Sequence, residues 1–564
     1  MRQLLIVSVI FVLAGCSSDE SYVEPRSDPE SVRPNILLIV VDDMGFSDLG
    51  SFGGEIRTPN LDALAYAGIR FSNFHTANTC SPTRSMLFTG VDSHRAGLGN
   101  MLEELAPNQK GQPGYEGHLN DRVVTLPTLM RDGGYRTYMT GKWHLGSGVG
   151  KGPAYRGFER SFSLNSGGAS HYADMRPSYA PSPDIKADYA EDGVKLKALP
   201  DDFEYSTQYY VDQMIEYLAD HGDSEDPFFA FLSFTAPHWP LQAPDDAVAR
   251  HKGRYDDGYD ALAKARLQRS KELGLVQSNA QVSSRSPKER PWDELNELEQ
   301  RSEIRAMEIY AAMIDEVDRH TGRLFNFLDS AGLSENTIVL FMSDNGAEGH
   351  DLDETWPMEA FPAIRKTIDD SFDFSYESMG RPGSYVLYGP NWANAASPAF
   401  RLHKAFPTEG GTRVAAFIYD PRVAEKTSTI VDNFVHVIDV TPTLLNYAGI
   451  DHPGETYRDR PIEPMTGQSF ADKLNDEASV SELPPVVSAE LFGKRAVRSG
   501  PWKLVHMPEP YGVNDWQLFN VETDLAEFSD LAVEYPEKVK ELLAHWEKYA
   551  DDNNVIIPDW VSGY

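Results

Sequence analysis

Three long apolar runs constrain the fold of this chain more than any other feature. The runs are Asn35 to Val41 (NILLIVV), Pro227 to Thr235 (PFFAFLSFT) and Thr337 to Met342 (TIVLFM). Continuous apolar runs of this length are typical of parallel strands covered by helices on both faces. Because helical patterns alternate with them, we expect an α/β fold with a doubly wound, mostly parallel sheet up to about residue 450.

The segments between these runs carry helix and strand signals of uneven strength. We expect helices over Thr58 to Gly68, Thr125 to Gly133, Tyr205 to His221 and Ser302 to Leu328, and a strand from Tyr135 to Thr140. Residues 147–202 are rich in Gly, Pro, Ser and Tyr, so we interpret them as long loops around the site. Residues 247–301 are charged and patchy, as in an insertion or an irregular helical segment.

The C-terminal part has a different pattern. Ala496 to Val505 and Trp516 to Asn520 resemble short antiparallel strands, and Pro536 to Tyr549 is an amphipathic helix. We therefore divide the chain into a large α/β domain, residues 35–450, and a smaller α+β domain, residues 451–564. A length of 564 residues is sufficient for one large core plus a smaller one.

The N-terminus reads as a targeting segment. Arg2 precedes an apolar run that ends in Leu13-Ala14-Gly15-Cys16, too short to cross a membrane as a helix. This string resembles a bacterial lipobox, which implies a signal peptide over residues 1–15 and a lipid on Cys16; an ordinary cleaved signal peptide is the alternative. Residues 16–34 would then be a polar tether. Either way we expect export, and with the lipid an anchor at the periplasmic face or outer membrane of the cell envelope.

The charge balance limits the partners of the chain. The formal net charge is −35, and a surface this acidic repels nucleic acid and anionic membranes. It also disfavours a polysulfated polymer as substrate, although a local basic pocket can still hold one sulfate. We expect no nucleic-acid partner.

Cys80 begins the most informative motif, the stretch to Gly90 that reads CSPTRSMLFTG. Pro82 suits a first helical turn, so Cys80 lies near a helix N-terminus, where unpaired N–H groups attract anions. Arg84, one turn later, can bind an oxyanion through two nitrogens. An isolated Cys-x-Pro-x-Arg is equally consistent with a buried structural cysteine, but with Cys16 lipidated Cys80 has no partner for an intrachain disulfide.

The whole string resembles the signature of the type I sulfatases, members of the alkaline-phosphatase-like superfamily. The resemblance implies that a separate formylglycine-generating enzyme oxidises Cys80 to formylglycine (3-oxoalanine). Gly141 to Gly146 (GKWHLG) resembles a second sulfatase signature, with Lys142 and His144 in its functional positions. A strand with a period of two residues would point both side chains into one pocket. A surface basic pair is the alternative.

The same resemblance assigns further residues. His238, after the second apolar run, aligns with the substrate-side histidine of the family, and Lys404 lies in a matching stretch, FRLHKAFPTEGGTR. We interpret Glu409 and Arg413 in that stretch as structural. Arg84, Lys142 and Lys404 would surround the sulfate, His144 would accept a proton, and His238 would protonate the leaving oxygen.

Polar residues that follow two of the strands predict a metal site. The implied metal set is Asp42, Asp43, Asp344 and Asn345 together with Cys80. Oxygen ligands of this kind favour Ca²⁺, with Mg²⁺ second, over zinc. In related phosphatases and phosphonate hydrolases the position of Asn345 is usually His, so the amide favours sulfate esters.

The resemblance therefore implies a sulfatase that hydrolyses small sulfate esters. Aryl sulfates are favoured by overall similarity to bacterial arylsulfatases and by the aromatic residues of the loops; alkyl and sugar sulfates are left open. Two alternatives stand beside it: a formylglycine-dependent phosphonate or phosphodiester hydrolase on the same fold, and a lipid-anchored binding protein without activity.

Overall fold

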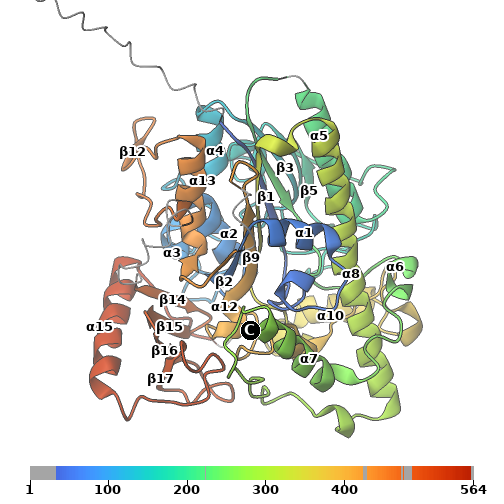
Figure 1. The fold of residues 1–564 in the computed structure, drawn as a ribbon, viewed down its shortest axis with the longest axis vertical. Helices are drawn as coiled ribbons and strands as arrows, with labels where there is room; N and C mark the ends of the chain where they lie inside the picture. The colour runs from blue at the N-terminus through green and yellow to red at the C-terminus, as the bar shows by residue number, and fades with distance from the viewer. Residues whose placement is uncertain (1–32, 223, 424–428, 472–473, 475–485, 561–564) are drawn as a thin grey trace, which may run out of the picture. The chain divides into compact units, whose positions relative to one another are not determined.

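An 11-stranded sheet contains the three apolar runs at its centre (Figure 1). β1 (Asn35–Val41) pairs in parallel with β7 (Phe228–Ser233) on one side and with β8 (Thr337–Ser343) on the other. The order along the sheet is β10-β2-β9-β8-β1-β7-β3-β4-β5-β6, with β11 beside β2. β9 (Arg413–Tyr419) runs antiparallel to both of its neighbours. The predicted mostly parallel α/β sheet is confirmed.

The computed structural model describes residues 33–222, 224–423, 429–471, 474 and 486–560. The predicted signal peptide, Cys16 and nearly all of the tether lie outside these residues. No helix within the described ranges is both long and apolar enough to cross a membrane. The other strands of the large sheet are β2 (Ile69–His75), β3 (Arg136–Lys142), β4 (Arg160–Leu164), β5 (Tyr189–Glu191), β6 (Val194–Lys195), β10 (Thr429–Val431) and β11 (Val435–His436).

Two predicted regions are more regular than the sequence indicates. Residues 147–202 contain β4, β5 and β6 as well as loops. In β4, the buried Phe162 and Leu164 alternate with serines. This alternating run is too short to predict a strand from the sequence. Residues 247–301 contain the whole of α7 (Gly258–Glu272), on which Leu267 is buried between the polar residues Arg266 and Gln268.

Helices cover both faces of the sheet, because apolar side chains of β1 point alternately to the two faces. Leu37 and Ile39 face one core, whereas Ile36 and Leu38 face the other. α1, α5 and α8 lie on the first side and α2, α4 and α13 on the second (Figure 1). Their bounds are α1 (Pro59–Ala67), α2 (Cys80–Thr89), α4 (Leu126–Asp132), α5 (Ser206–His221), α8 (Glu297–Ser330) and α13 (Val440–Ala448). The four predicted helices are thus confirmed, α8 being longer than expected at both ends.

Shorter elements lie in the connections. The helices are α3 (Ser93–Ala96), α6 (Asp245–Ala249), α9 (Leu352–Thr355), α10 (Pro362–Ser371), α11 (Gly389–Ala396) and α12 (Glu409–Thr412). The 3-10 turns are η1 (Gly50–Phe52), η2 (Leu102–Glu104), η3 (Pro153–Tyr155), η4 (Trp292–Glu294), η5 (Ser334–Asn336), η6 (Tyr376–Ser378) and η7 (Val437–Asp439). A small hairpin is formed by β12 (Thr456–Tyr457) and β13 (Arg460–Pro461).

The C-terminal region forms a separate antiparallel sheet covered by one helix (Figure 1). Its strands are β14 (Val487–Leu491), β15 (Lys494–Ser499), β16 (Trp502–His506) and β17 (Trp516–Asn520), and its helix is α15 (Pro536–Asp552). Val497, Leu504 and Leu518 pack against Leu542 and Trp546 of the helix. The predicted small α+β domain is confirmed, with β14 as a strand that the sequence analysis missed.

Buried polar contacts attach this small sheet to short helices of the large domain. Glu409, at the start of α12, is ion-paired with Lys503 of β16 at 2.8 Å and with Arg498 of β15 at 3.4 Å. His94 of α3 contacts Asp92 at 3.1 Å and Glu490 of β14 at 3.4 Å. These contacts support the interpretation of Glu409 as structural, because its carboxylate is occupied by cations of the small sheet.

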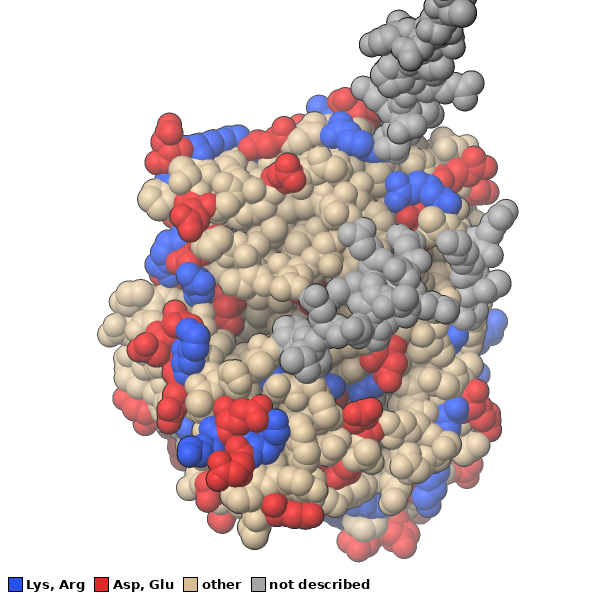
Figure 2. All heavy atoms as spheres, turned by 60° about the vertical axis from the view of Figure 1, so that its left-hand side comes forward, with Lys and Arg blue, Asp and Glu red and all other residues tan. Residues whose placement is uncertain are grey.

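The surface carries charges of both signs close together. Figure 2 shows Lys and Arg side chains beside Asp and Glu side chains over the visible face. Exposed pairs of this kind contribute little each, roughly 0 to 1 kcal/mol.

Candidate active site

Two strand ends bring together the acidic residues that the sequence predicts as metal ligands. β1 ends before Asp42 and Asp43, and β8 ends before Asp344 and Asn345. The strands are parallel neighbours with Val41 opposite Ser343, so their carboxyl ends meet at one edge. Ligand oxygens of the three aspartates and the sulfur of Cys80 all lie within 4.8 Å of one another.

Asn345 completes this pocket. Its Nδ2 donates to Asp43 Oδ1 at 2.7 Å and to the carbonyl of Gly346 at 2.9 Å. Its Oδ1 is buried and has no hydrogen-bond partner among the described residues. A buried carbonyl oxygen without a donor suits a hard cation, which would satisfy it.

The charges of the pocket also suit a cation. Burial, followed by the repulsion of Asp344, raises the pKa of Asp42 to about 8. Burial also raises the pKa of Asp43 to about 6, with Lys404 opposing the shift. Both shifts reflect carboxylates crowded in a dry site, and a divalent cation would remove this repulsion. The donor set therefore fits Ca²⁺ or Mg²⁺.

Two buried lysines reach the same carboxylates. Lys142 Nζ, at the end of β3, lies 2.5 Å from Asp42 Oδ2. Lys404 Nζ lies 2.9 Å from Asp43 Oδ1 and 3.0 Å from Glu348 Oε2. Burial lowers the pKa of Lys142, but Asp42, Cys80 and Asp344 together outweigh burial, so the pKa of Lys142 is raised and the ammonium is retained. Both predicted lysines are thus in the pocket.

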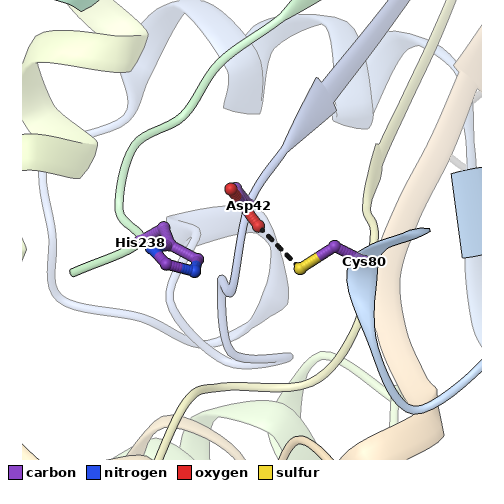
Figure 3. A group of neighbouring side chains, drawn as sticks. All are labelled: Asp42, Cys80 and His238. Atoms are coloured by element: carbon purple, nitrogen blue, oxygen red, sulfur yellow. Dashed lines mark hydrogen bonds between the residues drawn. The ribbon is translucent and has the colours of Figure 1, made fainter. Parts of the chain in front are cut away.

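Cys80 is the first residue of α2, as its motif predicts. Its thiol donates to Asp42 Oδ1 at 3.4 Å, and Figure 3 shows the sulfur pointing at that carboxylate with the ring of His238 across the pocket. Burial, and then the charge of Asp42, raise the pKa of the thiol well above its ordinary value. An unmodified Cys80 is therefore a protonated, weakly nucleophilic group.

Arg84 is fully buried one turn after Cys80. Its Nε donates to Asp344 Oδ2 at 2.9 Å, and its Nη1 donates to Ser233 Oγ at 2.7 Å and to the carbonyl of Lys142 at 2.9 Å. These contacts tie α2 to the ends of β3, β7 and β8. Ser233 was missed by the sequence analysis, although its place at the carboxyl end of an apolar strand was a signal for it.

His238 lies in the loop after β7. Its Nδ1 is 2.5 Å from the carbonyl oxygen of Trp239, so Nδ1 carries a proton and Nε2 faces Asp43 Oδ2 at 3.7 Å. Burial and the charges of Lys404 and Lys142 lower its pKa well below the ordinary value. The predicted histidine is thus in the pocket with Nε2 directed inward.

His144 is near the pocket, but the predicted strand geometry is wrong. β3 ends at Lys142, and His144 has a φ of 55° in the following turn. A continuous strand therefore does not place the two side chains on one side. The Nε2 of His144 instead lies 3.1 Å from Oε1 of Glu103, in η2. Nothing in the sequence indicated Glu103, because it lies in η2, outside both the Cys80 to Gly90 and the Gly141 to Gly146 motifs.

A second group of buried ligand types lies beside Lys404. Ligand atoms of Glu348, His350 and His403 lie within 4.8 Å of one another. Glu348 already contacts Lys404, and its Oε1 lies 2.9 Å from Nδ1 of His350. The nearby ammonium disfavours a second cation, so this group is better explained as support for Lys404.

Comparison with known proteins is consistent with this geometry. A family model described as Sulfatase matches residues 34–450. An uncharacterized sulfatase of Schizosaccharomyces pombe is 41% identical over 93% of this chain and 95% of its own length. An arylsulfatase of Klebsiella aerogenes is 39% identical over 78% of this chain and 91% of its own length. The crystal structure of Ps i-CgsB in complex with k-i-k-neocarrahexaose has a TM-score of 0.64 at 22% identity, covering 94% of this chain and 95% of that chain, and so shares the fold.

Proposed function

Because the chain belongs to the sulfatase family and therefore hydrolyses sulfate esters, we propose that its substrates are aryl sulfates. The choice of an aryl group is supported by the identity of 39% with an arylsulfatase over 91% of its length. The observation that carries the chemistry is the convergence of Cys80, two buried lysines and an acidic pocket at the strand ends.

Residue 80 needs activation before it can attack sulfur. The pKa of the thiol is raised well above its ordinary value by burial and by Asp42, which keeps it protonated. We propose that a formylglycine-generating enzyme converts Cys80 to formylglycine. The hydrated aldehyde supplies two hydroxyl groups, one to attack sulfur and one whose deprotonation releases sulfate.

The metal site would be formed by Asp42, Asp43, Asp344 and Asn345, with residue 80 beside them. Calcium is the first choice and magnesium the second, because every protein donor other than residue 80 is an oxygen. A cation held by these residues would supply Lewis-acid polarisation at the nucleophile.

The basic residues would bind the sulfate and stabilise charge as its ester bond breaks. An ammonium has three N–H groups, so Lys142 and Lys404 can keep their carboxylates and still donate to sulfate oxygens. Arg84 is held by Asp344 and Ser233, which fixes its guanidinium at the base of the pocket. No large movement is needed to form the anion site.

Two histidines would transfer protons. His238 has Nδ1 bonded to the carbonyl of Trp239, so Nε2 is the atom that faces the leaving oxygen, and it must take up a proton there before it can act as the general acid. Lys404, which shares Asp43 with His238, would assist it. His144 would accept the proton whose removal releases sulfate from residue 80.

The test of this proposal compares two substrates that share a 4-nitrophenyl leaving group with one sugar sulfate. Enzyme from a host that converts Cys80 is assayed with 4-nitrophenyl sulfate, with a 4-nitrophenyl phosphonate ester and with a sugar 6-sulfate. We expect the highest kcat/KM for the aryl sulfate. A faster phosphonate reaction would favour the alternative hydrolase, a faster sugar reaction would reject the aryl assignment, and no turnover of any substrate would favour a binding protein.

We further propose that the mature protein begins at Cys16, carries a lipid there and is attached to the cell envelope. The lipobox-like Leu13 to Cys16 supports this proposal. Cys16→Ser should abolish lipid labelling and release the protein from membranes. Unchanged processing and fractionation of the variant would overturn the proposal.

A further inference from the structure

We propose that Glu103 is a positioning residue for His144: it fixes the proton on Nε2 of the imidazole and leaves Nδ1 as the atom that accepts a proton at residue 80. This inference rests on the proposed function, in which His144 is the base. It assigns a role to a residue outside both sulfatase-like motifs.

The contact between the two residues sets the tautomer of His144. Nε2 lies 3.1 Å from Oε1 of Glu103. An ionised carboxylate only accepts hydrogen bonds, so a neutral His144 must carry its proton on Nε2. Nδ1 of His144 is buried and has no hydrogen-bond partner within the described ranges, which leaves its lone pair available.

Glu103 is itself held in place. The hydroxyl of Tyr179 donates to the same Oε1 at 2.6 Å. The ring of Tyr179 packs against Trp356 with centroids 4.9 Å apart and against Trp239 at 6.2 Å. The carboxylate therefore lies between a fixed phenol and the imidazole and has little freedom to turn away.

The chain passes so close to this group that only glycine fits. A Cβ at Gly167 would lie 2.1 Å from the hydroxyl of Tyr179 and 2.8 Å from Cε1 of His144. Side chains here would push apart the two donors that Glu103 joins. The backbone at Gly167 thus packs directly against the group formed by His144, Glu103 and Tyr179.

The electrostatics agree with an ionised Glu103 and a neutral His144. Burial alone would raise the pKa of Glu103, but the charge and hydrogen bond of His144, together with Tyr179, lower it to about 2. Burial lowers the pKa of His144, and Glu103 opposes that shift. At neutral pH the carboxylate thus orients an imidazole that is free to accept a proton.

The first experiment needs no catalysis. Full-length protein with unconverted Cys80 and ¹⁵N-labelled histidine is examined by NMR, with His144→Gln used to assign the resonance. We expect the Nε2–H tautomer in the wild type. In Glu103→Gln we expect loss of that tautomer preference and a lower pKa of His144, because the opposing charge is gone. The wild-type resonance in a folded Glu103→Gln protein would overturn the proposal.

The second experiment measures turnover of an aryl sulfate by converted enzyme. Glu103→Gln should lower kcat by about 10- to 100-fold, leave KM near the wild-type value and move the acid limb of the kcat profile to lower pH. Tyr179→Phe should lower kcat by a smaller factor. It replaces Glu103→Gln as the test variant if Glu103→Gln does not fold. Glu116→Gln, in the same loop but paired with Arg122, is the matched control.

The two experiments separate the two proposals. Suppose that Glu103→Gln loses the Nε2–H preference of His144 as expected, but the protein hydrolyses no sulfate ester. This result would reject the proposed function and keep the positioning role. An active enzyme whose Glu103→Gln variant keeps the wild-type kcat and pH profile would reject the positioning role alone.

Discussion

Asn345 Nδ2 donates a hydrogen bond to Asp43 Oδ1 at 2.7 Å, joining the ends of β8 and β1. This contact fixes the amide so that its carbonyl oxygen is left buried and without a donor. The acidic pocket thus presents an oriented neutral oxygen in addition to carboxylates. An aspartate at this position would add a fourth charge, and an alanine would remove the oxygen.

We expect Asn345→Ala to weaken Ca²⁺ binding by about tenfold or more, because it removes a ligand and loosens Asp43. Calorimetric titration of chelator-treated protein measures the affinity. Asn60→Ala is the control, since that amide bonds Asp318 on α8 instead. An unchanged affinity, or stoichiometric zinc found by elemental analysis, would contradict the metal assignment.

We expect the peptide that contains residue 80 to be lighter than its thiol form, by replacement of sulfur with oxygen and loss of two hydrogens, and to react with a carbonyl probe. Cys80→Ala should fold and be inactive. Cys80→Ser should turn over at most once, since it lacks the second hydroxyl needed to expel sulfate. Full activity from protein in which mass spectrometry finds only the thiol would refute the modification.

We expect His238→Ala to slow substrates with poor leaving groups more than 4-nitrophenyl sulfate. General acid catalysis contributes about 10²- to 10⁴-fold, and a phenolate of low basicity needs little of it. The slope of log(kcat/KM) against leaving-group pKa should therefore become steeper. An equal loss for every aryl sulfate would assign His238 to binding rather than to proton transfer.

The contact of His94 with Asp92 and Glu490 predicts a pH-dependent stability. Burial alone would lower the pKa of His94, but these two carboxylates raise it to about 9. Since this folded value exceeds the unfolded one, near 6.5, the stabilisation is complete below pH 6.5 and is lost as pH rises through 9. His94→Asn should therefore lower the free energy of unfolding by about 1 to 3 kcal/mol at pH 6 and by much less at pH 9.5.

Urea unfolding at the two pH values tests this prediction. His545→Asn, a half-buried position on α15, controls for general effects of pH on the small sheet. A loss that is the same at both pH values would show that His94 acts through packing and not through its charge.

The sequence was most informative where one physical signal dominates. β1 and β8 follow from continuous apolar runs, and their parallel pairing then places Asp42 and Asp344 together. The motif around Cys80 predicted its place at a helix N-terminus, which the structure confirms. These features depend on burial and on local sequence, so a single chain is enough to predict them.

Other parts of the site depend on contacts that no local pattern records. His144 follows a strand but lies outside it, because the chain turns after Lys142 and adopts a positive φ at residue 144. Glu103 reaches His144 from a loop 41 positions away in the sequence. β4 and β14 are short and only partly apolar, so tertiary pairing rather than propensity fixes them.

Glu409 lies five positions after Lys404, and its carboxylate is neutralised by cations from β15 and β16. The loop that carries a proposed sulfate-binding lysine is therefore braced by residues near the other end of the chain. Deleting the small sheet would remove two cations from the buried Glu409 and leave it with Arg413 at 3.5 Å and His75 at 3.7 Å; breaking a buried pair costs up to about 3 to 5 kcal/mol. A sheet taken from a relative could replace this one only if it carried cations at the positions of Lys503 and Arg498, so the two parts of the chain are coupled through Glu409.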